Sequence, residues 1–167
     1  MSFSLLADVE VRKITELEPQ WFSTRDIRLV LLDFDNTIVP YTTSEPSEEF
    51  VRWKAALEQA GIRIMVVSNS RKSRRVPDFC EKWSIPWIRH AGKPNPKGIR
   101  KAMERMNETP EHTAMAGDQT FTDILGANLA GVTSILAYPL YFSNPFQRIR
   151  YGIERPFIAA GRKKRKR

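Results

Sequence analysis

The stretch Ile27-Arg28-Leu29-Val30-Leu31-Leu32-Asp33-Phe34-Asp35-Asn36-Thr37 decides how the rest of the chain is interpreted. Its first part is a short apolar run of mostly branched residues, which predicts a buried β-strand over residues 27–32. Two carboxylates, Asp33 and Asp35, follow directly. If the chain turns there, one carboxylate can attack phosphorus or hold a cation while the other works as acid and base. Taken alone, such an Asp-x-Asp pair is more often a turn or a cap.

Strand and helix signals alternate along the rest of the chain. Pro77 is expected to interrupt or bend the second of the predicted helices. The alternation predicts an α/β fold, a Rossmann-like three-layer sandwich with a mainly parallel five-stranded sheet and helices on both faces. The further strands are predicted over residues 62–67, 85–88, 113–116 and 132–137, and the helices over residues 46–60, 71–83, 95–106 and 120–130.

Length and composition indicate one domain. The 167 residues suit a single folded unit, predicted over residues 1–160, followed by a basic tail over residues 161–167. No apolar run is longer than four residues, which excludes a membrane-spanning helix. Cys80 is the single cysteine and is expected to be buried, so no internal disulfide can form. With no basic start to suggest a cleaved signal peptide, we expect a cytoplasmic protein that could contact the inner face of the membrane.

The positive charge is concentrated at the C-terminus. The net charge is +8, and without the basic residues 162–167 it falls to +2, with 21 basic against 19 acidic residues. Such a run should be disordered when free, and it could bind an anionic membrane or RNA, or only solubilise the chain. Aromatic and basic residues interleave before it, which suits either a membrane interface or a cover over the sheet edge. These residues are Tyr138, Leu140, Tyr141, Phe142, Phe146, Arg148, Arg150, Tyr151, Arg155 and Phe157.

Polar residues follow the predicted strands at their carboxyl ends, where ligands bind in parallel sheets. Asp33 follows the first strand, Ser68 the second, Lys93 the third and Asp118 the fourth. Carboxylates gathered at one edge repel one another unless a cation neutralises them. Their oxygen ligands suit a hard ion such as Mg²⁺, and the Lys93 ammonium can balance both the carboxylates and a phosphoryl group.

As a set, these residues resemble the four-motif signature of the haloacid dehalogenase superfamily of phosphohydrolases. The motifs are Asp33-x-Asp35-x-Thr37, then Ser68, then Lys93, then Gly117-Asp118-x₄-Asp123, in the order of that superfamily. More narrowly, the chain is similar to the bacterial YqeG family, which is related to the mitochondrial phosphatidylglycerophosphate phosphatases. This similarity rests on the stretches 31–37, 67–70, Lys93-Pro94, 117–119, 122–123 and 126–128.

The resemblance implies a Mg²⁺-dependent phosphomonoester hydrolase that acts through an aspartyl-phosphate, with phosphatidylglycerophosphate or a similar accessible phosphate as substrate. Asp33 would be the nucleophile, Asp35 the acid and base oriented by Thr37, and Lys93 the stabilising cation. The implied phosphate-binding residues are Thr37, Ser68, Asn69 and Lys93, and the implied metal-binding residues are Asp33, Asp35 through its carbonyl, Asp118 and Asp123.

The spacing of the motifs leaves no room for a folded cap, because Thr37 and Ser68 are 31 positions apart and Ser68 and Lys93 are 25 apart. An open site suits a bulky or surface-bound substrate.

Two alternatives to a lipid phosphatase stay open. One is a ribosome- or RNA-associated protein that keeps the fold as a scaffold, and the other is a phosphatase of a soluble sugar phosphate, nucleotide or phosphoprotein.

Overall fold

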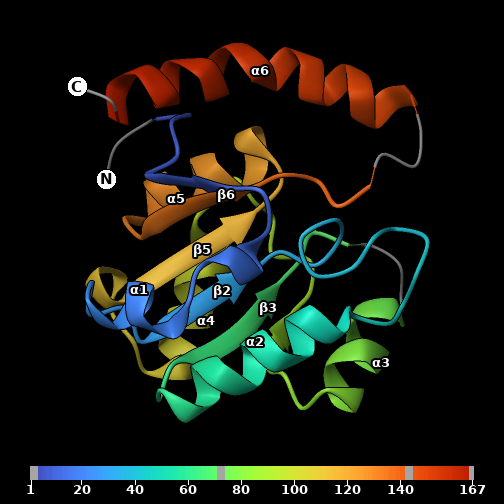
Figure 1. Cartoon of the computed structure of the whole chain (residues 1–167), viewed down its shortest axis with the longest axis vertical. Helices are drawn as coiled ribbons and strands as arrows, with labels where there is room; N and C mark the ends of the chain where they lie inside the picture. Colours follow the sequence, from blue (N-terminus) through green and yellow to red (C-terminus); the bar gives the residue numbers. More distant parts are fainter. Residues whose placement is uncertain (1–3, 71–73, 142–144, 166–167) are drawn as a thin grey trace.

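The computed structural model describes residues 4–70, 74–141 and 145–165, with no side chains described for Phe146, Gln147, Arg150 and residues 161–165. In this part of the chain one sheet of six strands has the spatial order β1-β6-β5-β2-β3-β4, and all neighbouring strands are parallel (Figure 1). The strands are β1 (Val9–Val11), β2 (Leu29–Leu32), β3 (Arg63–Val67), β4 (Trp87–Ile88), β5 (Thr113–Gly117) and β6 (Thr133–Ala137).

The predicted count of five strands is wrong, because β1 adds a sixth at the edge of the sheet. It pairs with β6, with Val9 opposite Ile135. Side-chain bonds fix this start: the Asp8 backbone N–H donates to Ser134 Oγ at 3.0 Å, and the Ser134 N–H donates to the Asp8 carboxylate at 2.9 Å. A strand of three residues is too short to show an alternating pattern, so the sequence pattern did not reveal it.

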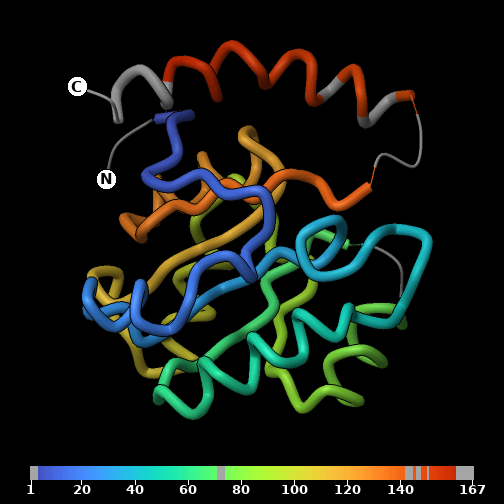
Figure 2. Tube along the Cα trace, in the orientation of Figure 1, coloured from blue at the N-terminus to red at the C-terminus, as the bar shows by residue number. Residues whose placement is uncertain are grey.

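Helices cover both faces of the sheet, which confirms the predicted three-layer α/β architecture (Figures 1 and 2). On one face lie α1 (Pro19–Ser23), α2 (Glu48–Gln59) and α3 (Arg75–Lys82), and on the other lie α4 (Lys97–Met106) and α5 (Leu125–Ala130). Single turns, η1 (Ile14–Glu16), η2 (Pro110–His112) and the π-helical η3 (Thr120–Ile124), join these elements. A long helix, α6 (Pro145–Arg165), ends the described chain.

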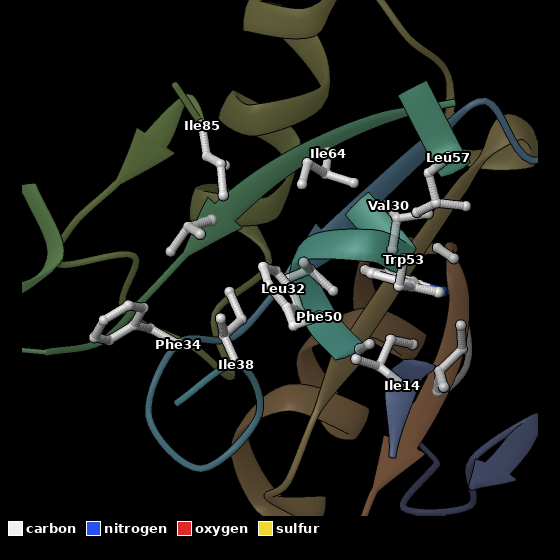
Figure 3. Close-up of a cluster of buried hydrophobic side chains, with 14 of the residues drawn as sticks. Ile14, Val30, Leu32, Phe34, Ile38, Phe50, Trp53, Leu57, Ile64 and Ile85 are labelled. Carbon is white, nitrogen blue, oxygen red and sulfur yellow. The ribbon is translucent and has the colours of Figure 1, made fainter. Parts of the chain in front are cut away.

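The central strand β2 is apolar throughout because both of its faces are covered. Val30 and Leu32 point into the cluster beneath α2, where they lie near Trp53, as Figure 3 shows. Leu29 and Leu31 point into the second cluster, among residues of α4 and α5. The Trp53 indole also donates a hydrogen bond to the carbonyl of Leu17 at 2.7 Å, which ties α2 to the N-terminal segment.

The N-terminal ends of α2 and α3 differ from the predicted starts of these helices. Ser47 caps α2 by accepting a hydrogen bond from the Phe50 N–H at 3.1 Å, so Pro46 precedes the cap instead of lying in the first turn. The prediction that Pro77 bends α3 is wrong. This helix begins at Arg75, so Pro77 lies in its first turn, where a backbone N–H has no helical acceptor. The start predicted at residue 71 lies outside the described residues.

The C-terminal helix α6 was not predicted, because Gly152 and Pro156 inside it disfavour a helix. Tertiary packing outweighs these propensities. Phe157 lies edge-on to Phe121 at 5.6 Å between ring centroids, and Tyr151 lies edge-on to Tyr138 at 6.1 Å. These aromatic residues therefore cover the edge of the sheet. Of the others in the predicted set, Phe142 and the side chain of Phe146 lie outside the described residues.

No element ends at the predicted domain boundary of residue 160, since α6 continues to Arg165. The disorder predicted for residues 161–167 stays a prediction, because residues 166–167 and all side chains from residue 161 lie outside the described part of the chain. None of the described helices is both long enough and apolar enough to span a membrane.

Candidate active site

A tight turn directly after β2 brings two carboxylates into one pocket. The Asn36 N–H donates to the carbonyl of Val39 at 2.7 Å, which folds the chain back on itself. Asn36 has φ of 64°, in the left-handed region that asparagine tolerates better than most residues. Asp33 and Asp35 both line the same cavity as a result. The turn that the Asp-x-Asp pair required is therefore present.

This cavity, of about 250 Å³, lies at the carboxyl end of the sheet. The cavity brings together Asp33 and Asp35, which follow β2, with Ser68 and Asn69, which follow β3. This confirms the predicted convergence for these two strand ends. Tyr41 and Gln119 also line it, although the sequence pattern gave them no role; Tyr41 lies in a predicted loop and Gln119 beside a motif residue. The lining residues are Asp33, Asp35, Tyr41, Ser68, Asn69, Ser70 and Gln119.

Lys93 lies between two carboxylates from different parts of the chain. Its Nζ is 2.7 Å from Asp33 Oδ1 and 2.7 Å from Asp123 Oδ1. Burial alone would lower the pKa of Lys93, but the two carboxylates outweigh burial and hold that pKa above its ordinary value. Burial raises the pKa of Asp33 to about 6, although Lys93 acts in the opposite direction. Lys93 is therefore a fixed positive charge in the site.

Asn69 holds the backbone of Lys93 in place. Its Nδ2 donates to the Lys93 carbonyl at 2.8 Å, and its Oδ1 accepts a hydrogen bond from the Lys93 N–H at 2.9 Å. Both ends of the side-chain amide are thus used by one residue. This contact joins the loop after β3 to the loop after β4, and the sequence pattern did not foresee it.

Three buried carboxylates form a group that suits a cation. Asp33, Asp118 and Asp123 each offer an oxygen, and these oxygens lie within 4.8 Å of one another. Among the described residues, Lys93 forms salt bridges with two of these carboxylates, Asp33 and Asp123. Carboxylates this close repel one another, and a divalent ion among them would relieve that repulsion. Oxygen donors of this kind fit a hard ion such as Mg²⁺.

The approach of Asp123 to the site depends on a glycine. A Cβ at Gly117 would overlap the Asp123 side chain, so only glycine leaves space for that carboxylate. The Gln119 N–H also donates to Asp123 Oδ2 at 3.0 Å. The predicted continuous helix over residues 120–130 is instead the π-helical turn η3 followed by α5, and this turn carries Asp123.

Arg75 contacts the second carboxylate of the pair. Its guanidinium forms a close ion pair with Asp35 Oδ1 and donates to the carbonyls of Pro40 and Thr43, each at 2.6 Å. It also lies 4.9 Å above the centre of the Phe34 ring. Arg75 therefore fastens the loop over residues 40–43 to Asp35. The sequence pattern did not predict this contact.

The two predicted hydroxyl residues lie in different surroundings. Ser68 lines the carboxylate pocket, and its Oγ accepts a hydrogen bond from the Ser70 N–H at 3.0 Å. Thr37 lines a neighbouring cavity of about 240 Å³. Its hydroxyl has no hydrogen-bond partner among the described residues.

A solved structure shares this fold. The cobalt-bound deoxy-D-mannose-octulosonate 8-phosphate phosphatase of Haemophilus influenzae superimposes with a TM-score of 0.54 at 17% identity, covering 69% of this chain and 80% of that chain. At this identity the likeness concerns the fold alone. Together with its sequence relatives, this fold identifies the chain as a phosphatase of the haloacid dehalogenase superfamily.

Sequence relatives narrow the class. The model of the family described as "Mitochondrial PGP phosphatase" matches residues 3–139. "Probable phosphatase YqeG" of Bacillus subtilis is 32% identical over 160 residues, 95% of this chain and 92% of that protein. The glyceraldehyde 3-phosphate phosphatase of Pyrococcus furiosus is 36% identical over 128 residues, 72% of this chain but 50% of that enzyme. The chain belongs to the mitochondrial PGP phosphatase family.

Proposed function

We propose that this phosphatase hydrolyses phosphomonoesters with Mg²⁺ through an aspartyl-phosphate on Asp33, and that its substrate is phosphatidylglycerophosphate or a similarly accessible phosphate. The observation that carries the proposal is the position of Lys93, 2.7 Å from both Asp33 and Asp123 in one buried carboxylate group. A buried ammonium there can offset the charge of both the nucleophile and an incoming phosphoryl group.

In the first step, a carboxylate oxygen of Asp33 attacks phosphorus and the bond from phosphorus to the ester oxygen breaks. Asp35, in its protonated form, donates its proton to the leaving alkoxide, which departs as an alcohol. Lys93 stabilises the charge on the reacting groups. Ser68, which lines the same cavity, contributes its hydroxyl to the phosphoryl oxygens.

In the second step, Asp35 is ionised and accepts a proton from water. The water oxygen attacks phosphorus, and the bond to Asp33 breaks to release inorganic phosphate and the free carboxylate. The ion pair with Arg75 holds the Asp35 carboxylate in place for this step. Asn69 acts indirectly in this scheme, by positioning the backbone of Lys93.

The side chains of Asp33 and Asp118, with the carbonyl of Asp35, are the groups we assign to Mg²⁺. When bound, the ion supplies charge neutralisation and orients the phosphoryl group. Asp123 supports the site through its ion pair with Lys93. The burial of the three carboxylates and their closeness to one another support this assignment.

The family to which the chain belongs supports a lipid phosphate as substrate. The described elements between Thr37 and Ser68 are α2 and β3, and those between Ser68 and Lys93 are α3 and β4. All of these belong to the layers of the core fold, which supports an accessible site. Similarity to the Pyrococcus furiosus enzyme supports a soluble phosphomonoester as the second candidate, although the chain spans half of that enzyme.

The test is Mg²⁺-dependent phosphate release from detergent-dispersed phosphatidylglycerophosphate, measured beside glyceraldehyde 3-phosphate and other soluble phosphomonoesters. Asp33→Asn is the control for the active site. We expect lipid-selective release that this substitution abolishes. Release from the soluble esters alone would contradict the lipid substrate but leave the proposed reaction mechanism standing. No release from any ester would contradict the proposal and favour the RNA-associated alternative.

A further inference from the structure

Four large apolar side chains are exposed in the described part of the chain, and all four lie in one segment. They are Leu140, Tyr141, Ile149 and Ile153. Ile149 and Ile153 are 62% and 58% exposed, and because they are four positions apart they share one face of α6. Ile149 and Ile153 thus form an apolar stripe on the outer side of one helix, and adjoining exposed apolar groups are typical of an interaction surface. We call the four residues, together with the exposed Arg148 and Arg155, the α6 surface.

The outer face of α6 is not needed to hold the helix on the domain. The inner face does this, with Ile158 buried beside Ile124 and Leu136, and with Phe157 packed on Phe121. In Figure 1, α6 runs along the outside of the molecule, above β6 and α5. The outward isoleucines therefore contribute little to the fold and are available for a partner.

The same segment carries the charge imbalance of the whole chain. Residues 145–167 contain nine of the 27 Lys and Arg and one of the 19 Asp and Glu, so they account for the full net charge of +8. Residues 1–144 hold 18 of each sign. The one acidic residue of the segment, Glu154, is buried, whereas Arg148 and Arg155 are exposed.

We propose that the α6 surface binds the surface of a bilayer that contains anionic lipid. Interfacial helices combine these two features, because aliphatic side chains enter the boundary of the acyl chains while arginines remain at the headgroup phosphates. An exposed basic residue near such a membrane also gains from its negative surface potential. A nucleic acid would satisfy the arginines, but its phosphate backbone offers no apolar layer for Ile149 and Ile153.

The α6 surface is joined to the catalytic loop. The Leu140 N–H donates to the carbonyl of Asn36 at 3.1 Å, in the turn that carries Asp33 and Asp35. Bilayer binding would thus hold the active-site edge of the sheet near the lipid headgroups. The purpose of this membrane binding rests on the proposed lipid substrate. The binding itself can be measured without turnover.

The test is co-sedimentation of the full chain with vesicles of phosphatidylcholine and phosphatidylglycerol, compared with vesicles of phosphatidylcholine alone. The variant Ile149→Ser/Ile153→Ser removes the apolar stripe, and Ile149→Leu/Ile153→Leu is its matched control. Arg148→Gln/Arg155→Gln removes the charge, and Arg52→Gln/Lys101→Gln, which removes two exposed charges elsewhere, is the control for that variant.

We expect the chain to bind the anionic vesicles, and the serine and glutamine variants to lose about tenfold or more in affinity. Both control variants should bind as the original chain does. Equal binding by the serine variant, absence of binding to anionic vesicles, or binding to RNA that the serine substitutions leave unchanged would overturn the inference. Hydrolysis of a soluble phosphomonoester is measured in parallel. Hydrolysis of phosphatidylglycerophosphate is measured in parallel as well. Absence of phosphate release from every ester, together with intact vesicle binding, would count against the proposed function alone.

Discussion

Lys93 and Asp33 form a buried ion pair between residues 60 positions apart in sequence, with 2.7 Å between Nζ and Oδ1. The Lys93 side chain is 1% exposed, so its charge is shielded from water and directed at the carboxylates. Such a pair adds little stability in itself, but removal of one partner leaves an uncompensated buried charge. Lys93 therefore has a structural and a chemical part in the site, and the two can be separated experimentally.

The substitution Lys93→Met keeps the length of the side chain and removes its charge. We expect it to abolish turnover and, with a chelator present, to lower the free energy of unfolding by about 3–5 kcal/mol. Urea unfolding followed by fluorescence measures this change. Lys101→Met, at an exposed position of α4, should change neither property. An unfolding free energy equal to that of the original chain would show that Lys93 does not balance the carboxylates.

Gly117→Ala tests whether Asp123 needs the space above the end of β5. The added methyl group would overlap the Asp123 carboxylate, so this side chain must move away from Lys93. We expect a loss of about tenfold or more in kcat/KM together with weaker Mg²⁺ binding. Gly152→Ala is the matched control. A Cβ there meets nothing within 4 Å, and alanine in a helix is favoured over glycine. Full activity of Gly117→Ala would contradict the role of Asp123.

Arg75→Gln tests whether Arg75 positions Asp35 and its loop. The substitution removes the ion pair with Asp35 and the bonds to the carbonyls of Pro40 and Thr43. We expect kcat to fall by about 10- to 100-fold, and Arg75→Lys to restore part of the loss, since lysine keeps the charge but not the planar fork. Arg74→Gln, which removes an exposed ion pair with Asp78, should leave kcat unchanged. Equal kcat for Arg75→Gln and Arg74→Gln would exclude the positioning role.

Metal affinity should depend on pH through Asp33. Burial raises the pKa of Asp33 to about 6 in the protein without a bound ion, with Lys93 acting against this rise. Below that pKa the carboxyl binds a proton, which competes with a cation, so apparent Mg²⁺ affinity should fall about tenfold per pH unit. Above that pKa the affinity should level off. Calorimetric titration from about pH 5 to about pH 8 measures this dependence. An affinity that stays constant through pH 6 would exclude Asp33 as a ligand that must lose its proton.

The convergence of Asp33 and Ser68 in one pocket could be predicted from the sequence, because parallel strands place their carboxyl ends at one edge. The apolar run of β2 made that strand recognisable, since both of its faces are buried. The group of Asp33, Asp118 and Asp123 was expected for the same reason.

Other features depend on contacts that no sequence pattern expresses. The strand β1 is held by Asp8 and Ser134, two residues 126 positions apart. The helix α6 forms in spite of Pro156 because its inner face packs on η3 and β6. Arg75, at the start of α3, contacts Asp35, a residue 40 positions away in sequence. In each case tertiary contacts, and not local propensity, decide the structure.

The most direct test of the proposed chemistry uses Asp35→Asn with p-nitrophenyl phosphate. This leaving group departs without a proton, so the first step proceeds, whereas the second step lacks its base and the intermediate accumulates. We predict a burst of p-nitrophenol close to the amount of enzyme, and a phosphoryl group found by mass spectrometry on the peptide at Asp33. Asp33→Asn should show neither. A phosphoryl group on another residue, or turnover by Asp33→Asn, would contradict catalysis through Asp33.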